Sequence, residues 1–337
     1  MKNKVIRTIC YFNKKSGISI LNKLKNIIEI LQQHDYEIQT KRICIKETTI
    51  KEIASIYNDP SLLLSVGSLN KKSIENQLQD FYKVKNVLFN YHLLNTITIY
   101  DVNILFEIIK NYPENSFHFA FTFNNIKSSP YLPSADYERD GFSIGLQSTD
   151  LSENCDSIEE WLSNIKKTWI EINNLFSNNK EFLGIDSSIA PLFNGKSSLI
   201  HIIKKYYKSF IDSVTKDIYL KISNFIKKQN PNPVGLCGIM FPCLEDFELA
   251  LEYEKGNFPI ERNVFLSLHS GLGIDTYPIG IDESKDRVFE ILSLLQGLSN
   301  KYKKPLSARF VSDGITKIGN KTDFKNQYLK DVVIRRL

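Results

Sequence analysis

Long apolar runs and closely spaced cysteines are both missing from this sequence of 337 residues. No apolar stretch approaches the roughly 18 residues of a membrane span, and the opening MKNKVIRTICYFNKK resembles a short strand, not the apolar core of a signal peptide. The five cysteines are odd in number, widely spread and without a CxxC or Cys/His pattern, which argues against a disulfide framework or structural zinc. We therefore expect a cytoplasmic protein with no membrane partner.

Common catalytic motifs are missing as well. The chain has no GxxxxGK[ST], no GxGxxG after a first strand, no HExxH and no GxSxG, which removes the usual arguments for a nucleotide site, a zinc protease or an esterase. The net charge of +5 comes from 43 basic and 38 acidic residues, and the lysines are spread along the chain. Clusters such as Lys204-Lys205 and Lys227-Lys228 fall inside helical patterns, as on a solvated helix face, so we expect no nucleic-acid partner.

Short apolar runs alternate with stretches of helical periodicity, which predicts an α/β fold with parallel strands. Strands are expected at 5–11, 36–45, 61–67, 87–93, 117–123, 142–148, near Gly235 and at 306–310, and helices at 18–33, 50–57, 71–81, 101–112, 152–176, 199–228, 244–254, 286–302 and 328–336. No repeat, linker or abrupt change of composition interrupts this order. We therefore expect one continuous domain over residues 1–337.

Acidic, sulfur-containing and small residues gather at the ends of apolar runs between Gly235 and Arg309. This region contains VGLCGIMFPCLED, VFLSLHSGLGIDTYPIG and KKPLSARF. In α/β proteins the scaffold fixes each strand, and the loop that follows can carry the chemistry. We therefore expect the functional site among these segments.

The same region carries a family resemblance. The segments GLCGIMFPCLED, GLGIDTYPIG, KKPLSARF and GNKTDF, preceded by YLPSADYERDGFSIGLQSTDL and FLGIDSSIAP, resemble successive motifs of domain-of-unknown-function family 711, also called uncharacterised protein family 0210. That family resembles the pyruvate formate-lyase fold, so the resemblance implies a single large α/β barrel of ten strands. It implies no particular reaction.

Three features depart from the pattern that the resemblance implies. Gln147 in GLQSTDL stands where the family motif GLESADL has a glutamate, and Ser270 stands where a cysteine is expected. The glycyl-radical loop of the wider superfamily has no match, because Gly319 in KIGNKTDF does not fit it. We therefore expect chemistry that does not use a glycyl radical.

Three residues are candidates for catalysis. Asp275 follows glycines that would allow a ligand to approach closely, and Glu245 lies at the end of an apolar run, where it could act as a general base or complement a helix dipole. Cys237 lies between glycines in GLCGIM, where it is either a reactive thiol or a small buried side chain.

Four aspartates could together hold a divalent cation. If Asp186, Asp246, Asp275 and Asp323 converge, their mutual repulsion requires a cation, and hard oxygen ligands favour magnesium or calcium, with iron left open by nearby His269. Alternatively, Asp246 caps a helix, and Asp186 and Asp323 are turn residues.

Polar residues near these acids are expected to bind the substrate. The set comprises Arg309, Lys304, Ser188, Ser270 and Thr276. Arg309 should either meet a carboxylate or bind an anionic substrate group, because a buried unpaired guanidinium is costly. We expect an enzyme that acts on a small, polar, carboxylate-bearing metabolite beneath a lid at 124–140. The alternative is a metabolite-binding protein without catalysis, and a homo-oligomer stays open.

Overall fold

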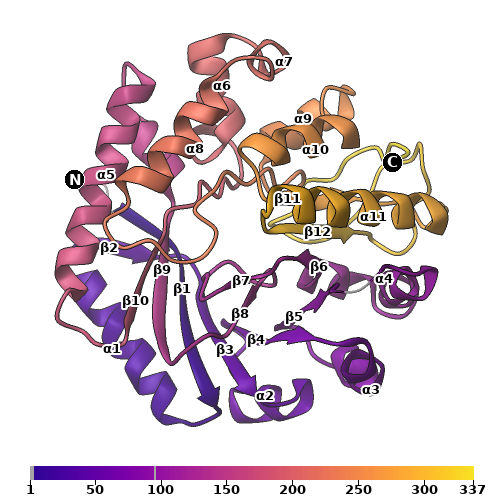
Figure 1. Ribbon diagram of the computed structural model, residues 1–337, viewed down its shortest axis with the longest axis horizontal. Coiled ribbons are helices and arrows are strands. Elements are labelled where there is room, and N and C mark those ends of the chain that lie inside the picture. The colour runs from indigo at the N-terminus through magenta and orange to yellow at the C-terminus, as the bar shows by residue number, and fades with distance from the viewer. Residues whose placement is uncertain (1–3, 95) are drawn as a thin grey trace. The chain divides into compact units, whose positions relative to one another are not determined.

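The structure, a computed structural model, describes residues 4–94 and 96–337 (Figure 1). The chain divides into two compact units. Unit 1 comprises Met1–Asn90, Ile126–Ile189 and Asn224–Gly238, and unit 2 comprises Tyr91–Asn125, Ala190–Ser223 and Ile239–Leu337. Each unit therefore collects segments that are distant in sequence.

Unit 1 is built on a mostly parallel sheet with the strand order β10-β9-β1-β3-β4-β5, and β2 lies beside β1. Strands β1, β3 and β4 run parallel, whereas β9 runs antiparallel to β1 and parallel to β10. The elements are β1 (Lys4–Lys15), α1 (Ser19–Gln33), β2 (Tyr36–Ile38), β3 (Lys41–Glu47), α2 (Ile50–Ile56), β4 (Leu62–Leu69), α3 (Lys71–Phe81), β5 (Val87–His92, whose last two residues belong to unit 2), β7 (Ile126–Lys127), β8 (Ala135–Asp136), β9 (Gly141–Leu146), η2 (Ser148–Ser152), α5 (Ile158–Phe176) and β10 (Phe182–Asp186).

Helices α1 and α5 cover one side of β1, β9 and β10 (Figure 1). Helix α1 buries Ile20, Leu24, Ile27 and Leu31, spaced three or four residues apart as one helical stripe requires. On α5, Phe176 meets Phe142 of β9 edge to face, with ring centroids 5.1 Å apart. This face is the apolar, helix-covered side of the sheet.

The opposite face of the sheet packs against the segment that follows β7 and ends with β8. We call this segment, Ser128–Asp136, the plug segment. Its Leu132 and Ala135 join Cys10 and Cys44 in one buried cluster. Asn90 is the last residue of the first segment of unit 1. Its Nδ2 donates to the carbonyls of Pro133 and Ala135 at 2.8 and 3.1 Å. The segment expected to form a lid is therefore largely buried inside unit 1.

Unit 2 has the strand order β6-β12-β11, in which β11 and β12 are parallel and β6 is antiparallel to β12. Its elements are α4 (Ile99–Asn111), η1 (Pro113–His118), β6 (Phe119–Phe123), η3 (Gly195–Ser197), α6 (Leu199–Tyr207), α7 (Phe210–Ser213), the first half of α8 (Ile218–Gln229), α9 (Phe247–Glu254), α10 (Ile260–His269), β11 (Gly273–Pro278), α11 (Lys285–Tyr302) and β12 (Leu306–Val311).

Two sequence expectations about helices are wrong. The stretch 199–228 is not one helix, because Lys208 adopts a left-handed φ of 63° and Ser209 then caps α7. The stretch 328–336 is not helical, because its amides bond elsewhere: Val333 N donates to Glu254 Oε1 at 2.9 Å, and Arg335 N donates to the Tyr253 hydroxyl at 2.7 Å.

The region around Gly235 is also not a regular strand. It makes isolated parallel bridges, Pro233 with Ile185 and Pro242 with Asp275, and Cys237 between them has a φ of 46°. VFLSLH, grouped with the apolar runs of the sequence, is the end of helix α10. The residues thought to follow strands here therefore lie on irregular backbone or beside a helix.

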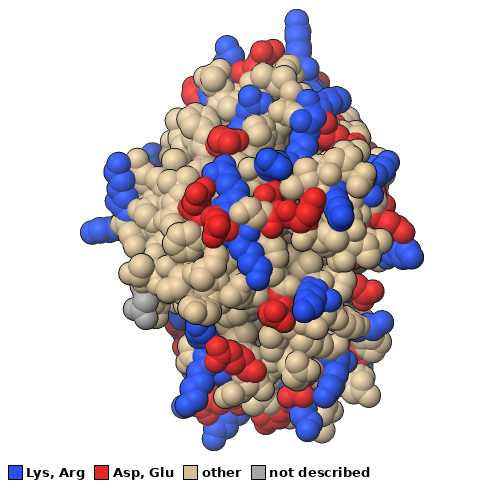
Figure 2. Space-filling model, turned by 90° about the vertical axis from the view of Figure 1, so that its right-hand side faces the viewer, with Lys and Arg blue, Asp and Glu red and all other residues tan. Residues whose placement is uncertain are grey.

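The α/β class is confirmed, and within each unit the described strands form an open order with two ends. Across residues 4–94 and 96–337 no helix combines the length and apolar character needed to cross a membrane. On the face shown in Figure 2, basic and acidic side chains are interspersed.

Replacing Asn90 should loosen the plug segment. Asn90→Ala leaves two buried carbonyls without their donor, so we expect a loss of about 2 kcal/mol or more in the free energy of unfolding. Urea unfolding measures this, with the exposed Asn111→Ala as control. Equal stability of the two variants would contradict the role given to Asn90.

Candidate functional site

A strip of mostly polar positions lies on the inner face of unit 1, the face that meets the plug segment. Cys10 packs with Leu132 of the plug segment, so its face of β1 is the inner one. Residues paired across strands share a face, and so do residues two apart along a strand. The register therefore assigns to this face Thr8, Cys10, Arg42, Ser143, Gly145 and Asp186, which we call the inner strip.

Two arginines of unit 1 are buried, namely Arg42, which belongs to the inner strip, and Arg7. The pairing of β1 with β9 shifts register between Ile6 and Thr8, which leaves Arg7 as an extra residue. Such bulges re-aim a side chain and are common beside active sites. Arg7 and Arg42 are each 7% exposed, and Arg42 Nη1 donates to the carbonyl of Leu132 at 3.2 Å.

The plug segment places Tyr131 on the inner strip. A Cβ added at Gly145 would lie 2.5 Å from Tyr131 Oη, so only glycine leaves room there. This buried Oη has no hydrogen-bond partner among the described residues. Burial raises the pKa of Tyr131, Asp186 raises it further, and Arg7 and Arg42 oppose this. The hydroxyl therefore stays protonated and can donate.

Two more polar atoms near Tyr131 are buried without partners. Within the described ranges, neither Ser143 Oγ nor Gln147 Oε1 makes a hydrogen bond. The other end of the Gln147 amide is fixed, because Nε2 donates to Thr149 Oγ1 at 2.6 Å. Ser143, Gly145 and Gln147 alternate along one strand direction, which places all three on the inner side.

Asp186 ties three segments of unit 1 together. Its fully buried carboxylate accepts from Ser129 Oγ at 2.6 Å, from the amide and hydroxyl of Ser188 at 3.0 and 2.6 Å, and from the amides of Leu236 and Cys237 at 2.9 and 3.1 Å. Burial raises the pKa of Asp186, and these donors lower it without cancelling the rise. Both oxygens are thus occupied by protein donors.

The loop that donates to Asp186 has an unusual backbone. Gly235 has a φ of 75°, and a Cβ there would come within 2.4 Å of Asp186 Oδ2. Cys237 holds a φ of 46°, a conformation that costs a non-glycine residue free energy and often marks functional sites. Burial raises the pKa of the Cys237 thiol, and Asp186 adds to this rise. Cys237 is therefore a neutral thiol.

Arg309 of β12 is the centre of a charged cluster in unit 2. Its Nε donates to Asp275 Oδ1 and its Nη2 to Glu245 Oε2, both at 2.7 Å. Its Nη1 donates to the Phe117 carbonyl at 3.3 Å, and the guanidinium lies 4.9 Å from the Phe117 ring centre. Burial alone would lower the pKa of Arg309, but the two carboxylates raise it overall. The structure thus brings three of the predicted residues together.

Asp275 keeps one carboxylate oxygen outside this cluster, and its side chain is 22% exposed. The next residue, Thr276, is a β-branched residue at a φ of 42°, which is a genuine backbone outlier. Its buried Oγ1 lacks a hydrogen-bond partner in the described part of the chain. Of the two carboxylates predicted to be catalytic, Asp275 therefore has the more accessible side chain.

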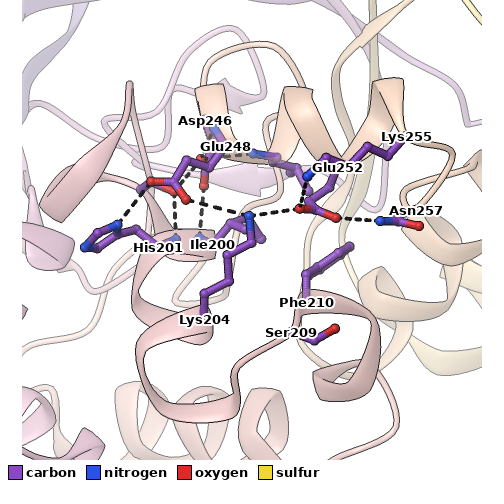
Figure 3. A network of polar contacts seen from close by, with 12 residues as sticks. Ile200, His201, Lys204, Ser209, Phe210, Asp246, Glu248, Glu252, Lys255 and Asn257 are labelled. Carbon is purple, nitrogen blue, oxygen red and sulfur yellow. Dashed lines mark hydrogen bonds and ion pairs between the residues drawn. The ribbon is translucent and has the colours of Figure 1, made fainter.

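Asp246 caps two helices of unit 2 at once (Figure 3). Its fully buried carboxylate accepts from the start of α6 and of α9, namely from Ser198 Oγ, Leu199 N, Ile200 N, Glu248 N and Leu249 N. Burial raises the pKa of Asp246 to about 6, although Ser198 and the backbone amides lower it. Asp246 is therefore a helix cap, which is the alternative to a metal ligand that the sequence left open.

Ion pairs beside Asp246 also join α6 to α9. In Figure 3, Lys204 of α6 reaches Glu252 of α9, with Nζ and Oε1 2.8 Å apart, and His201 Nδ1 lies 3.2 Å from Glu248 Oε1. The sequence predicts that Lys204 and Lys205 lie on a solvated helix face. In the structure, Lys204 instead contacts a neighbouring helix.

The remaining predicted residues of unit 2 have local roles. Lys304 Nζ donates to the carbonyls of Ser267 and Leu268 at the end of α10, at 2.7 and 3.2 Å. Ser270 Oγ donates to the Leu266 carbonyl at 2.9 Å. Exposed Asp323 lies beside the ammonium group of a neighbouring lysine.

The four aspartates do not fit the divalent cation that their number suggested. Asp186 and Asp246 each use both oxygens on protein donors, Asp275 pairs with Arg309, and Asp323 is exposed. In the part of the chain that the structure describes, no three His, Cys, Asp or Glu side chains are grouped as metal ligands would be. No step of the chemistry is therefore assigned to a metal.

The fold and the inner strip define an α/β protein with buried polar side chains on one face of the unit 1 sheet. The chain belongs to the family described as Uncharacterised ACR (DUF711), whose model matches residues 72–325. None of the curated proteins compared with the chain matches it. The family resemblance is thereby confirmed.

Apart from Asp186, sequence reasoning missed the inner strip and the residues beside it. Arg7 in KVIRTIC and Arg42 in KRICIK are charged residues inside apolar strand patterns, and that signal could have drawn attention to them. Ser143 and Tyr131 give no comparable signal, because their place depends on strand register and on the path of the plug segment.

Asp246→Asn should be destabilised in a pH-dependent way. The folded pKa of about 6 lies above the ordinary 3.8, so the folded chain binds this proton more tightly than the unfolded chain. Its contribution to stability is thus greatest at low pH and is lost as the pH rises through about 6. The stability gap between wild type and variant should be about 1 kcal/mol wider at about pH 5 than at about pH 8.

Urea unfolding at the two pH values measures this gap. Exposed Asp217→Asn is the control and should show no comparable change. A gap that is equal or wider at the higher pH would contradict the assignment.

Proposed function

We propose that this chain binds a small polar metabolite through its carboxylate at the inner strip of unit 1, and that it acts on that metabolite as an enzyme. The observation that carries the proposal is the buried Tyr131 hydroxyl, a donor without a partner, close to the charges of Arg7 and Arg42. A buried polar group left unpaired costs about 1–3 kcal/mol, and a bound carboxylate oxygen would remove that cost.

The charges of this region favour an anion. Arg7 and Arg42 are buried and place positive charge near Tyr131. The five donors around Asp186 already occupy its carboxylate. The oxygens of a bound carboxylate can accept from Tyr131 and Ser143 in short, charge-assisted hydrogen bonds.

An enzyme requires a group that moves a proton or attacks the substrate. Within unit 1 the predicted catalytic residue is Cys237. Asp275, with Glu245 beside it, stays a separate prediction for unit 2, where one Asp275 oxygen lies outside the Arg309 ion pair. Cys237 is the weaker nucleophile, because the thiolate is the reactive form and burial raises the pKa of this thiol.

The second candidate is a metabolite-binding protein without catalysis. It is favoured by the state of two groups that act on Tyr131, since both oxygens of Asp186 already accept hydrogen bonds and Cys237 is a neutral thiol. On this alternative the inner strip binds its ligand and changes no bond in it.

We also infer that the strands follow the ten-stranded plan of the pyruvate formate-lyase-like barrel. Supporting this, parallel β1, β3 and β4 of unit 1 meet the parallel β9–β10 pair with β9 antiparallel to β1, and the parallel β11–β12 pair of unit 2 meets β6, which is antiparallel to β12. The bridges of Pro233 to β10 and of Pro242 to β11 add to this support. A crystal structure of the whole chain tests it.

Four further expectations stay predictions. They are a cytoplasmic location, the lack of a nucleic-acid partner, chemistry without a glycyl radical at Gly319, and an oligomeric state that is still open. Chromatography with light scattering measures the last, and backbone cleavage at Gly319 in air would overturn the third.

Tyr131→Phe should weaken carboxylate binding without weakening the fold. The variant removes a donor that has no partner among residues 4–94 and 96–337, so folding loses nothing, whereas the bound carboxylate loses a contact of about 1.5–3 kcal/mol, or at least tenfold in affinity. Calorimetric titration with small carboxylates such as butanoate, alongside urea unfolding, measures both quantities.

Tyr57→Phe is the matched control. The Tyr57 hydroxyl bonds to both the amide and the carbonyl of Gly17, at 3.0 and 3.1 Å, so its loss should weaken the fold and leave binding unchanged. A Tyr131→Phe variant that binds butanoate as well as wild type would sink the proposed site.

Turnover separates the enzyme from the binding protein. Asp275→Asn should reduce turnover far more than Cys237→Ser, because the Asp275 side chain is partly accessible, whereas burial raises the pKa of the Cys237 thiol. Incubation with pooled small carboxylic acids, followed by mass spectrometry, measures consumption. Thermal stabilisation by an acid that is never consumed would support the binding protein instead.

A further inference from the structure

Gln147 presents a fixed hydrogen-bond acceptor toward the inner side of unit 1. The residue is 3% exposed, its Nε2 donates to Thr149 Oγ1 at 2.6 Å, and its buried Oε1 has no partner within residues 4–94 and 96–337. An amide held at its nitrogen cannot turn freely, so the oxygen keeps its direction. A buried acceptor of this kind costs the fold free energy unless a ligand or water donates to it.

Gln147 lies close in sequence to the residue that Tyr131 covers. Tyr131 Oη lies over Gly145, and Gln147 follows directly after β9, with its amide still bonded to the carbonyl of Val5 in β1. Two residues of extended backbone span about 6.6 Å between Cα atoms, which is the scale of a short carbon chain.

We propose that Gln147 Oε1 accepts a hydrogen bond from a hydroxyl group of the metabolite, whose carboxylate binds at Tyr131. The inference rests on the proposed function and narrows its substrate class to short hydroxycarboxylic acids. A hydroxyl is favoured over an ammonium group, because Arg7 and Arg42 lie close to the same ring and repel a cation. A plain carboxylate leaves Oε1 unpaired and binds more weakly.

Butanoate and its 2-, 3- and 4-hydroxy derivatives are the probes, titrated calorimetrically into the full chain. Wild type should bind 3- or 4-hydroxybutanoate about tenfold or more tightly than butanoate, which corresponds to one well-placed hydrogen bond. Gln147→Leu should bind all four acids about equally, whereas the surface variant Gln33→Leu should keep the preference. If Gln147→Leu does not fold, Gln147→Met serves in its place.

Different results overturn different claims. Equal binding of all four acids by wild type, with butanoate affinity still lost in Tyr131→Phe, would overturn the role of Gln147 and leave the proposed function intact. A hydroxyl preference that survives in Gln147→Leu would also overturn the role of Gln147 and leave the proposed function intact. Tighter binding of 3-oxobutanoate than of the hydroxy acids would mean that the amide donates, and would also overturn the inference. No binding of any of these acids would overturn the proposed function itself.

Discussion

The buried carboxylate of Asp186 is the interaction on which the inner side of unit 1 depends. It is the last residue of β10, and it bonds to Ser129 beside the plug segment's Tyr131 and to the amides of Leu236 and Cys237. One charge with five donors thus fixes a strand end, the plug segment and a strained loop. Because the protein already uses both oxygens, Asp186 organises the inner strip, and the proposed ligand contacts fall to Tyr131 and Ser143.

A second aspartate plays the same part in unit 2. Asp246 caps α6 and α9 together, and Lys204 crosses between the same helices to Glu252. Buried carboxylates that are saturated by amides resemble metal ligands in a sequence, since both occur next to small residues at the ends of elements. Their hydrogen bonds distinguish the two roles, and here those bonds assign Asp186 and Asp246 to structure.

Much of the fold could be predicted from local pattern, and the helix at Lys71–Phe81 has the expected bounds. Pattern failed where contacts distant in sequence decide the backbone. The left-handed turn at Lys208 divides one apparent helix, and amides after Tyr328 bond to distant groups, Val333 and Arg335 among them to side chains of α9, instead of within a helix of their own. The pairing of Arg309 with a carboxylate followed from the cost of burying it alone. The position of Tyr131 could not be predicted in this way, because it depends on the register of β9 and on the path of the plug segment.

The departure at Gln147 has a local physical reason. Where the family motif has a glutamate followed two residues later by alanine, this chain has an amide followed by Thr149, and the threonine hydroxyl accepts from that amide. The substituted pair therefore keeps an oxygen fixed by its amide nitrogen while removing a negative charge. This change agrees with the anion binding proposed above.

A crystal structure of the chain soaked with butanoate tests the central claim most directly. The account predicts a carboxylate oxygen about 2.7 Å from Tyr131 Oη, on the inner side of β9, with the Asp186 hydrogen bonds unchanged. A carboxylate bound elsewhere, with the Tyr131 hydroxyl still without a ligand, would contradict it.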